Sequence, residues 1–201
     1  MQYKNTFLKN NAAFKPIFLS TILKKKKFSK TQPLRTRVSP CHRRYKFVES
    51  PSFNLGVSGK VLRVEYDPYR SSGVSLVLFK NNICSYYLTV HTVCTGDLLT
   101  AYLYSNSFLE YKRGDSSVVQ HIPSSLPVNQ IETKIQTGTT YIRSAGGYAM
   151  ILRKQSLNNI AVLRMPSGKL KNIPLNSFAT IGVVGNINYQ NKVFFKAGQR
   201  R

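Results

Sequence analysis

The chain contains 201 residues, 42% of them hydrophobic, and carries 30 Lys and Arg against seven Asp and Glu, for a formal net charge of +23. The hydrophobic fraction is normal for a folded protein, but this charge cannot be neutralised within the chain and repels itself unless a polyanion is bound. Nucleic acid is the commonest such partner, and an acidic membrane surface is the second. No segment approaches the roughly 20 apolar residues that span a bilayer, and three cysteines give no disulfide framework.

The first 48 residues form a purely cationic segment, because no acid precedes Glu49 and positions 24–27 are all lysine. The segment shows no clean hydrophobic period, and residues 34–46 have the composition of an extended basic arm. We therefore predict a long basic N-terminal extension over residues 1–48. In an isolated protein such a segment is a solvated, disordered tail, so the sequence leaves open whether it binds a partner.

Residues 49–122 alternate short β-branched and aromatic runs with turn signals such as Asp67-Pro68 and Gly96-Asp97. The predicted strands are 61–66, 74–79, 84–93, 98–104 and 118–122. Five short strands joined by tight turns are typical of a small closed barrel, so we predict an OB-like barrel here.

Two prolines, Pro123 and Pro127, mark the clearest boundary in the chain, and a second set of short strands follows over residues 123–196. These strands are predicted at 130–134, 148–153, 160–164, 169–173 and 179–184. Their spacing near ten residues predicts a second all-β barrel. Residues 197–201 remain as a C-terminal stub, and the predicted fold class is all-β throughout.

The sequence offers little for catalysis or metal binding. Glu65 and Asp67 are the one close pair of acids, and they are either a general acid/base pair or, as we expect, turn acids with Asp67 paired to Arg70. Cys41-His42 and His91 with Cys94 lack the usual spacing of a zinc site. We expect no enzyme activity, no metal and no cofactor.

Basic and aromatic residues instead gather in arms and turns. Residues 42–46 place four donors beside Tyr45, and Arg143 is followed by small residues over 144–147. Arginine binds phosphate bidentately and tyrosine stacks on unpaired bases, while small residues allow close approach of a sugar-phosphate chain. Either run, taken alone, is also compatible with a solvated surface.

Several motifs, in their order and spacing, resemble the universal second protein of the large ribosomal subunit in its bacterial-type form. Residues 42–45 resemble the family's His-Lys-Arg-Arg-Tyr arm, and residues 65–71 its Glu-Tyr-Asp-Pro-Asn-Arg-Ser turn. Residues 143–146 resemble its Ala-Arg-Ser-Ala-Gly-Thr loop, and 196–198 its Lys-Ala-Gly. The resemblance spans roughly residues 42–198.

The resemblance implies an OB-like barrel followed by an SH3-like barrel, both docked on large-subunit ribosomal RNA as a scaffold near the peptidyl transferase region, beside neighbouring ribosomal proteins. Arg70, Arg143 and residues 42–46 correspond to RNA contacts, and Tyr86 stands where a basic residue is usual, so we expect it to stack. The expected RNA-binding residues are Arg35, Arg37, His42, Arg43, Arg44, Tyr45, Lys46, Lys60, Tyr69, Arg70, Ser71, Tyr86, Arg143, Ser144, Ala145, Gly146, Lys169, Lys171, Lys196, Arg200 and Arg201.

The family continues beyond the position of Arg201 with an arm that bears a His-Pro-His-Gly-Gly-Gly-Glu motif. We expect either that a separate chain carries this arm or that it is lost. The departures from the bacterial pattern, and the many Asn, Lys, Tyr, Ile and Phe residues typical of an AT-rich genome, lead us to expect a mitochondrial ribosomal protein encoded in the organelle.

Three other functions stay open at this point. A free single-strand nucleic-acid-binding OB-fold protein needs an aromatic stripe on one barrel face. Tyr86, Tyr87, Tyr102 and Tyr104 are the residues that would supply it. An RNA-modifying enzyme would depend on Glu65 or Asp67. A membrane-surface protein would use the same cationic character without inserting into the bilayer.

Overall fold

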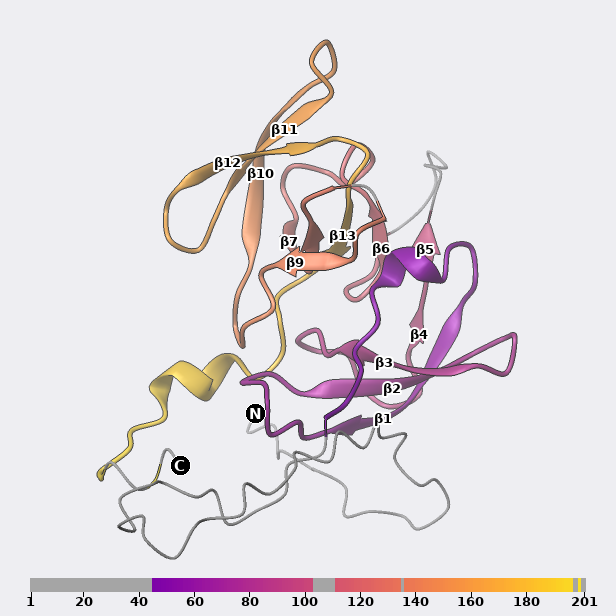
Figure 1. Cartoon of the computed structure of the whole chain (residues 1–201), viewed down its shortest axis with the longest axis vertical. Helices are drawn as coiled ribbons and strands as arrows, with labels where there is room; N and C mark the ends of the chain where they lie inside the picture. The colour runs from indigo at the N-terminus through magenta and orange to yellow at the C-terminus, as the bar shows by residue number, and fades with distance from the viewer. Residues whose placement is uncertain (1–44, 103–110, 135, 197–198, 200–201) are drawn as a thin grey trace, which may run out of the picture.

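The computed structural model describes residues 45–102, 111–134, 136–196 and 199, and within these ranges the chain is almost entirely β (Figure 1). Two short 3-10 helices, η1 (Pro51–Phe53) and η2 (Ile187–Asn191), accompany the strands, and no α-helix occurs in the described part. No helix there has the length and apolar character needed to cross a membrane. The predicted all-β class is confirmed.

The smaller sheet has the order β3-β2-β1-β4 and is antiparallel. Its strands are β1 (Gly59–Glu65), β2 (Val74–Phe79), β3 (Cys84–Leu88) and β4 (Leu98–Leu99). Alternate residues point to opposite faces, and both faces are covered: Val77 and Tyr87 pack on one side, Leu76 and Tyr86 on the other. Because both faces of this sheet are covered, the rings of Tyr86 and Tyr87 are buried and not exposed to solvent.

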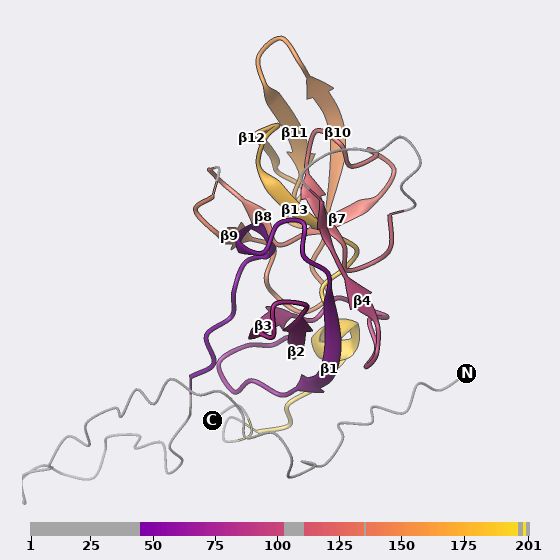
Figure 2. The same ribbon diagram turned by 90° about the vertical axis from the view of Figure 1, so that its right-hand side faces the viewer.

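The larger sheet has the order β12-β11-β10-β7-β13-β6-β5, and only its β5–β6 pair is parallel. Figure 2 shows β10, β11 and β12 rising away from the smaller sheet. Its strands are β5 (Ala101–Tyr102), β6 (Ser116–Val118), β7 (Pro127–Asn129), β10 (Ala149–Gln155), β11 (Ile160–Arg164), β12 (Leu170–Pro174) and β13 (Phe178–Ile181). A separate two-stranded sheet pairs β8 (Ile131–Glu132) with β9 (Thr139–Tyr141).

The main core lies against the larger sheet and includes Val128, Ile131, Leu163 and Ile181, each at most 2% exposed. The strands predicted at 74–79 and 160–164 are confirmed with the same bounds. β6 overlaps the start of the strand predicted at 118–122 and pairs with β13. The proposed domain limits 49–122 and 123–196 stay a prediction.

The strand predicted over 84–93 is wrong at its end, because β3 stops at Leu88. The chain then leaves the smaller sheet to meet the larger part of the molecule. Val90 forms an antiparallel bridge with Val184, and the backbone N–H of His91 donates to the carbonyl of Val183 at 2.7 Å. This bridge is one of the places where the two β units are joined.

A buried carboxylate makes a second junction. Glu132, on β8, has no exposed surface, and Oε1 accepts a hydrogen bond from the Ser52 hydroxyl. Its Oε2 accepts from the backbone N–H groups of Gln136 at 3.3 Å and Phe178 at 3.5 Å. One side chain therefore connects η1, the β8–β9 hairpin and β13, which are far apart in sequence.

Replacing Glu132 with alanine should destabilise the fold strongly. The variant removes the acceptor of the Phe178 N–H and of the Ser50–Ser52 hydroxyl pair, in which one buried hydroxyl can still donate to the other. An unsatisfied buried donor costs about 1–3 kcal/mol. We expect Glu132→Ala to lower the free energy of unfolding in urea by about 3 kcal/mol. Glu49→Ala removes only a 3.4 Å hydrogen bond with Asn54 and should cost less than about 1 kcal/mol; equal losses would contradict the junction.

Candidate nucleic-acid interface

The carboxylates of the described chain are all engaged by the chain itself. Each accepts at least one hydrogen bond from a side chain or a backbone N–H, and these acids are Glu49, Glu65, Asp67, Asp97, Asp115 and Glu132. Ion pairs within the described residues involve only Glu65 and Asp67. Most of the described cations therefore have no internal carboxylate, which leaves a large surface charge for an external polyanion.

The turn after β1 is held rigidly by Asp67, which is fully buried. Its Oδ1 accepts a hydrogen bond from the backbone N–H of Tyr69 at 3.0 Å, and its Oδ2 accepts from Nε of Arg70 at 3.1 Å. The expected pairing of Asp67 with Arg70 is confirmed. Asp67 is thus a structural acceptor that fixes the two residues after Pro68 in place.

Ser71 and Ser72 join this turn to the second unit. The hydroxyl of Ser71 accepts from the backbone N–H of Ala145 at 3.1 Å, and its carbonyl accepts from Nδ2 of Asn186 at 2.7 Å. The hydroxyl of Ser72 donates to the carbonyl of Arg143 at 3.4 Å. We call the surface made by residues 69–72, 142–147 and 186, together with Tyr45, the seam.

The loop that carries Arg143 is held in an unusual conformation. Ile142 has φ of 57°, a left-handed value that costs an L-residue roughly 1–2 kcal/mol and that is rare for a β-branched side chain. Its carbonyl accepts from the N–H of Gln130 at 3.1 Å. Gly146 has φ of 68°, a conformation that residues with a side chain rarely adopt, whereas a Cβ there would make only an ordinary 3.4 Å contact with Cα of Ile187. The backbone conformation therefore favours glycine here.

Arg143 is the least compensated cation of the seam. Burial lowers its pKa, the charge of Arg70 lowers it further, and Tyr45 opposes the shift. Arginine stays protonated in proteins, so the shift measures how poorly its surroundings satisfy a positive charge. No carboxylate in the described ranges pairs with it. An anion placed between Arg143 and Arg70 would relieve this repulsion.

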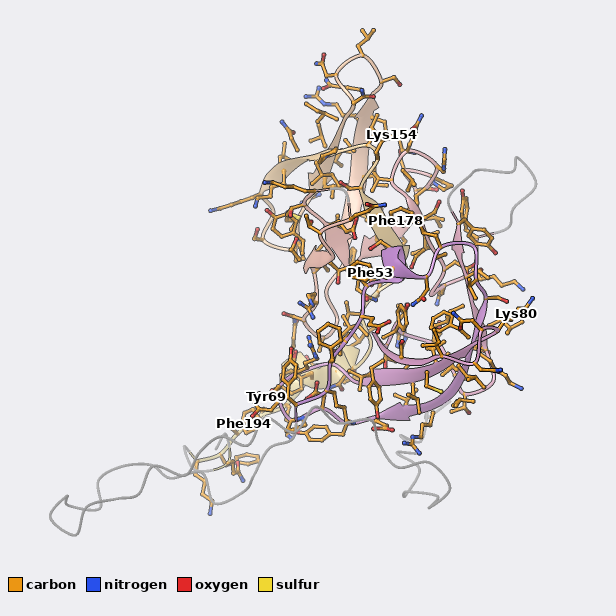
Figure 3. All side chains as sticks on the ribbon, turned by 45° about the vertical axis from the view of Figure 1, so that its right-hand side comes forward. Phe53, Tyr69, Lys80, Lys154, Phe178 and Phe194 are labelled. Atoms are coloured by element: carbon orange, nitrogen blue, oxygen red, sulfur yellow. The ribbon has the colours of Figure 1, made fainter. Side chains whose placement is uncertain are left out.

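Two tyrosines flank these arginines. The rings of Tyr45 and Tyr69 meet edge to face, with centroids 5.8 Å apart and planes at 64°. They are 37% and 44% exposed. Figure 3 shows Tyr69 at one side of the molecule, with Lys80 at the opposite side of the view. The seam therefore combines cations with accessible aromatic rings.

Lys46 and Tyr86 lie inside the protein. The ammonium of Lys46, which is 5% exposed, pairs with Glu65 and donates to the carbonyl of Tyr66 at 2.9 Å. The hydroxyl of Tyr86, which is 3% exposed, donates to Glu65 at 3.0 Å. The entering chain forms a parallel bridge with Tyr86, and the Val48 side chain packs against the cluster that contains Tyr86. The ring of Tyr86 is therefore not placed on the surface where stacking would occur.

The remaining predicted contacts are spread around the molecule. Lys60, Lys169 and Lys196 are exposed, and Ser144 is exposed within the seam loop. Lys171 is exposed too, and its ammonium lies 4.2 Å from the ring centroid of Tyr141. Seven predicted residues lie outside the described ranges: Arg35, Arg37, His42, Arg43, Arg44, Arg200 and Arg201. The structure thus brings together Tyr45, Tyr69, Arg70, Ser71 and residues 143–146.

Sequence reasoning missed Asn186 and Ser72 as parts of the seam. Asn186 has φ of 62°, and a turn asparagine that tolerates this conformation was the one available signal. No group of three or more His, Cys, Asp or Glu suited to a metal occurs in the part of the chain that the structure describes. Glu65 pairs with Lys46 and Asp67 pairs with Arg70, so each carboxylate is engaged with its own cation and the two are not arranged as a catalytic pair.

Comparison with protein families gives two matches. The model for Ribosomal Proteins L2, RNA binding N-terminal domain, matches residues 24–101, and that for Ribosomal Proteins L2, C-terminal domain, matches residues 112–201. The matches cover most of the chain, and they support the OB-like barrel and the following SH3-like barrel. Residues 69–72 fall in the first match, and residues 142–147 and 186 in the second, so the seam joins both.

Replacing Ser71 with alanine tests the junction. The buried N–H of Ala145 loses its acceptor, so its amide hydrogen exchange should accelerate and stability should fall by about 1 kcal/mol. Ser144→Ala is the matched control, because no hydrogen bond of the Ser144 hydroxyl occurs in the described chain. Unchanged exchange at Ala145 in Ser71→Ala would contradict this junction.

The Glu65 network predicts a pH dependence. Burial alone would raise the pKa of Glu65, but the hydrogen bond and charge of Lys46, with hydrogen bonds from Arg63 and Tyr86, hold it below the ordinary 4.5. A carboxyl whose pKa is lowered in the folded state contributes stability that is fully present above its ordinary pKa. That stability is lost as the pH falls through the lowered, folded-state pKa. Unfolding measured between neutral and acid pH should therefore show Glu65→Gln losing less stability than wild type below pH 4.5.

Tyr87→Phe is the control for this titration. Its hydroxyl accepts a hydrogen bond from Asn54 and does not contact Glu65, and burial raises the pKa of Tyr87 to about 12. The variant should keep the wild-type pH dependence in the acid range. If the stability of wild type and of Glu65→Gln fell equally between neutral and acid pH, Glu65 would not be the source of the pH dependence.

Proposed function

The chain belongs to the family of ribosomal proteins L2, which are structural, RNA-binding proteins of the large ribosomal subunit, and on that premise we propose that its seam is a contact with large-subunit ribosomal RNA. The protein acts as a scaffold and performs no chemistry. The two β units hold the turn after β1 and the loop before β10 in place, and these segments present Arg70 and Arg143 to folded RNA.

The observation that carries this proposal is the placement of Arg143. Its guanidinium is half-buried, lies close enough to Arg70 for like-charge repulsion, and has no described carboxylate to pair with. Guanidinium groups bind phosphate oxygens bidentately and more strongly than neutral donors do. A backbone phosphate of RNA would give Arg143 an anionic partner and would also offset its repulsion with Arg70, which the fold pairs with Asp67.

The remaining contacts extend this surface. We propose that Tyr45, Tyr69, Ser71, Ser144 and Gly146 line the same RNA, and that Lys60, Lys169, Lys171 and Lys196 bind phosphates elsewhere. Ala145 is 4% exposed and supports the loop through its N–H to Ser71. The flanking residues Arg35, Arg37, His42, Arg43, Arg44, Arg200 and Arg201 are proposed as contacts from the basic segments on either side. Tyr86 is left out because its ring is 3% exposed, and Lys46 because its charge is engaged by Glu65.

We also propose a mitochondrial ribosome as its location, near the peptidyl transferase region and beside other ribosomal proteins. The support is the composition, rich in Asn, Lys, Tyr, Ile and Phe as expected of an AT-rich genome, and the resemblance to the bacterial-type family. Fractionation of mitochondrial lysate on a high-salt sucrose gradient tests the location: the chain should migrate with large subunits. Recovery only in free protein or in another compartment's ribosomes would exclude it.

The burial of two tyrosines argues against a free single-strand binder. Such a protein would need Tyr86 and Tyr87 on an open barrel face, but they are 3% and 6% exposed. Tyr102 is half-buried beside Tyr111, and Tyr104 lies outside the described residues. The aromatic surface that a single-strand binder would need is therefore buried at both Tyr86 and Tyr87.

Arg143→Ala should weaken binding to a large-subunit RNA transcript about tenfold and reduce the slope of log affinity against log salt by about 1, because one phosphate contact is lost. Lys80→Ala removes the same charge from an exposed position on the other side of the molecule (Figure 3) and should have a smaller effect. Filter binding across a salt series measures both. Equal losses in the two variants would indicate a non-specific charge effect.

A further inference from the structure

The corner formed by Tyr45 and Tyr69 has a character that phosphate binding alone does not explain. A tyrosine hydroxyl can donate to a phosphate, but exposed ring surface, at 37% and 44% for these two residues, adds nothing to that contact. Clustered apolar surface on a folded protein commonly marks a contact site. Two aromatic residues close in sequence are exposed as well, Phe47 at 56% and Tyr66 at 66%. The Tyr45–Tyr69 corner thus offers π surface on a seam that carries two arginines.

The backbone at both tyrosines is held by the protein before any ligand binds, and their rings contact each other. Tyr69 is fixed by the hydrogen bond from its N–H to Asp67 and by the Pro68 that precedes it. Tyr45 precedes Lys46, whose buried ammonium is anchored between Glu65 and the Tyr66 carbonyl. A preorganised site loses little conformational entropy on binding, so the geometry of this corner suits a specific ligand.

We propose that the Tyr45–Tyr69 corner binds an unpaired nucleobase of the RNA, stacked on one tyrosine ring, while the adjacent phosphate lies against Arg143. This inference rests on the proposed function and specifies the RNA that the seam takes: a single-stranded loop, bulge or end. Proteins recognise unpaired bases by stacking them on aromatic rings, whereas a continuous A-form helix presents mainly its sugar-phosphate backbone. Because the ring planes meet at 64°, a base stacked parallel to one ring turns its own edge toward the face of the other.

The discriminating experiment compares three RNA probes of equal length bound by the full chain at one salt concentration. They are a mixed-sequence single strand, the same ribose-phosphate strand without bases, and a duplex. The single strand should bind about tenfold more tightly than the abasic strand, the size expected of one stacked base. Tyr69→Leu should reduce that ratio several-fold, and Tyr69→Phe, which keeps the ring, should preserve it.

Two controls separate this site from the phosphate contact and from general aromatic effects. Phe53→Leu removes an aromatic side chain that is 61% exposed and lies apart from Tyr69 in Figure 3, so the ratio should not change. Arg143→Ala should weaken binding to all three probes with the ratio retained. If Arg143→Ala weakens binding but Tyr69→Leu leaves the ratio intact, the stacking site is refuted and the RNA contact stands. If neither variant matters, the proposed function fails at the seam.

A measurement on the unaltered chain guards against misfolded variants. RNA substituted with 5-iodouridine crosslinks under light to an aromatic ring on which the base stacks. Peptide mapping of the crosslinked single strand should locate the attachment at Tyr45 or Tyr69. Attachment only at other aromatic residues, or equal crosslinking by the substituted duplex, would overturn the proposal.

Discussion

The hydrogen bonds of Ser71 hold the two β units of this protein in one arrangement. Its hydroxyl accepts from the N–H of Ala145 and its carbonyl accepts from Asn186, so a turn after β1 and a loop before β10 share one surface. Arg70 and Arg143 are more than 70 positions apart in the chain. Together with the Val90–Val184 bridge and the hydrogen bond of Ser72 with Arg143, this connection brings both arginines to one surface.

The scarcity of acids explains why that surface stays positive. Carboxylates of the described chain serve as internal acceptors: Asp67 fixes a turn, Glu65 anchors the arm through Lys46, and Glu132 connects η1 with β8 and β13. Each therefore stabilises the fold locally. Asp67 offsets the charge of Arg70, whereas no described carboxylate pairs with Arg143. Because the carboxylates are used inside the fold, most of the described cations have no internal carboxylate partner and remain able to bind RNA, as expected of a ribosomal protein of the L2 family.

Much of the fold followed from local sequence, because β-branched runs bounded by turn residues define strands such as β2 and β11. The site was predicted where a residue's role is local, as for Arg70 beside Asp67. Tyr86 was assigned to RNA because the resemblance places a basic residue there, and Lys46 because it lies in a basic run. Neither signal shows that Val48 packs against Tyr86 or that Lys46 pairs with Glu65. The role of Asn186 was hidden for the same reason, since its partner Ser71 is distant in sequence.

The central claim is that the seam faces ribosomal RNA, and cryo-electron microscopy of large ribosomal subunits that contain this chain tests it most directly. The account predicts a phosphate within hydrogen-bond distance of the Arg143 guanidinium, about 3 Å from nitrogen to oxygen, with RNA continuing past Arg70. A map in which the seam faces solvent, or is covered by another protein with no RNA near Arg143, would contradict the account.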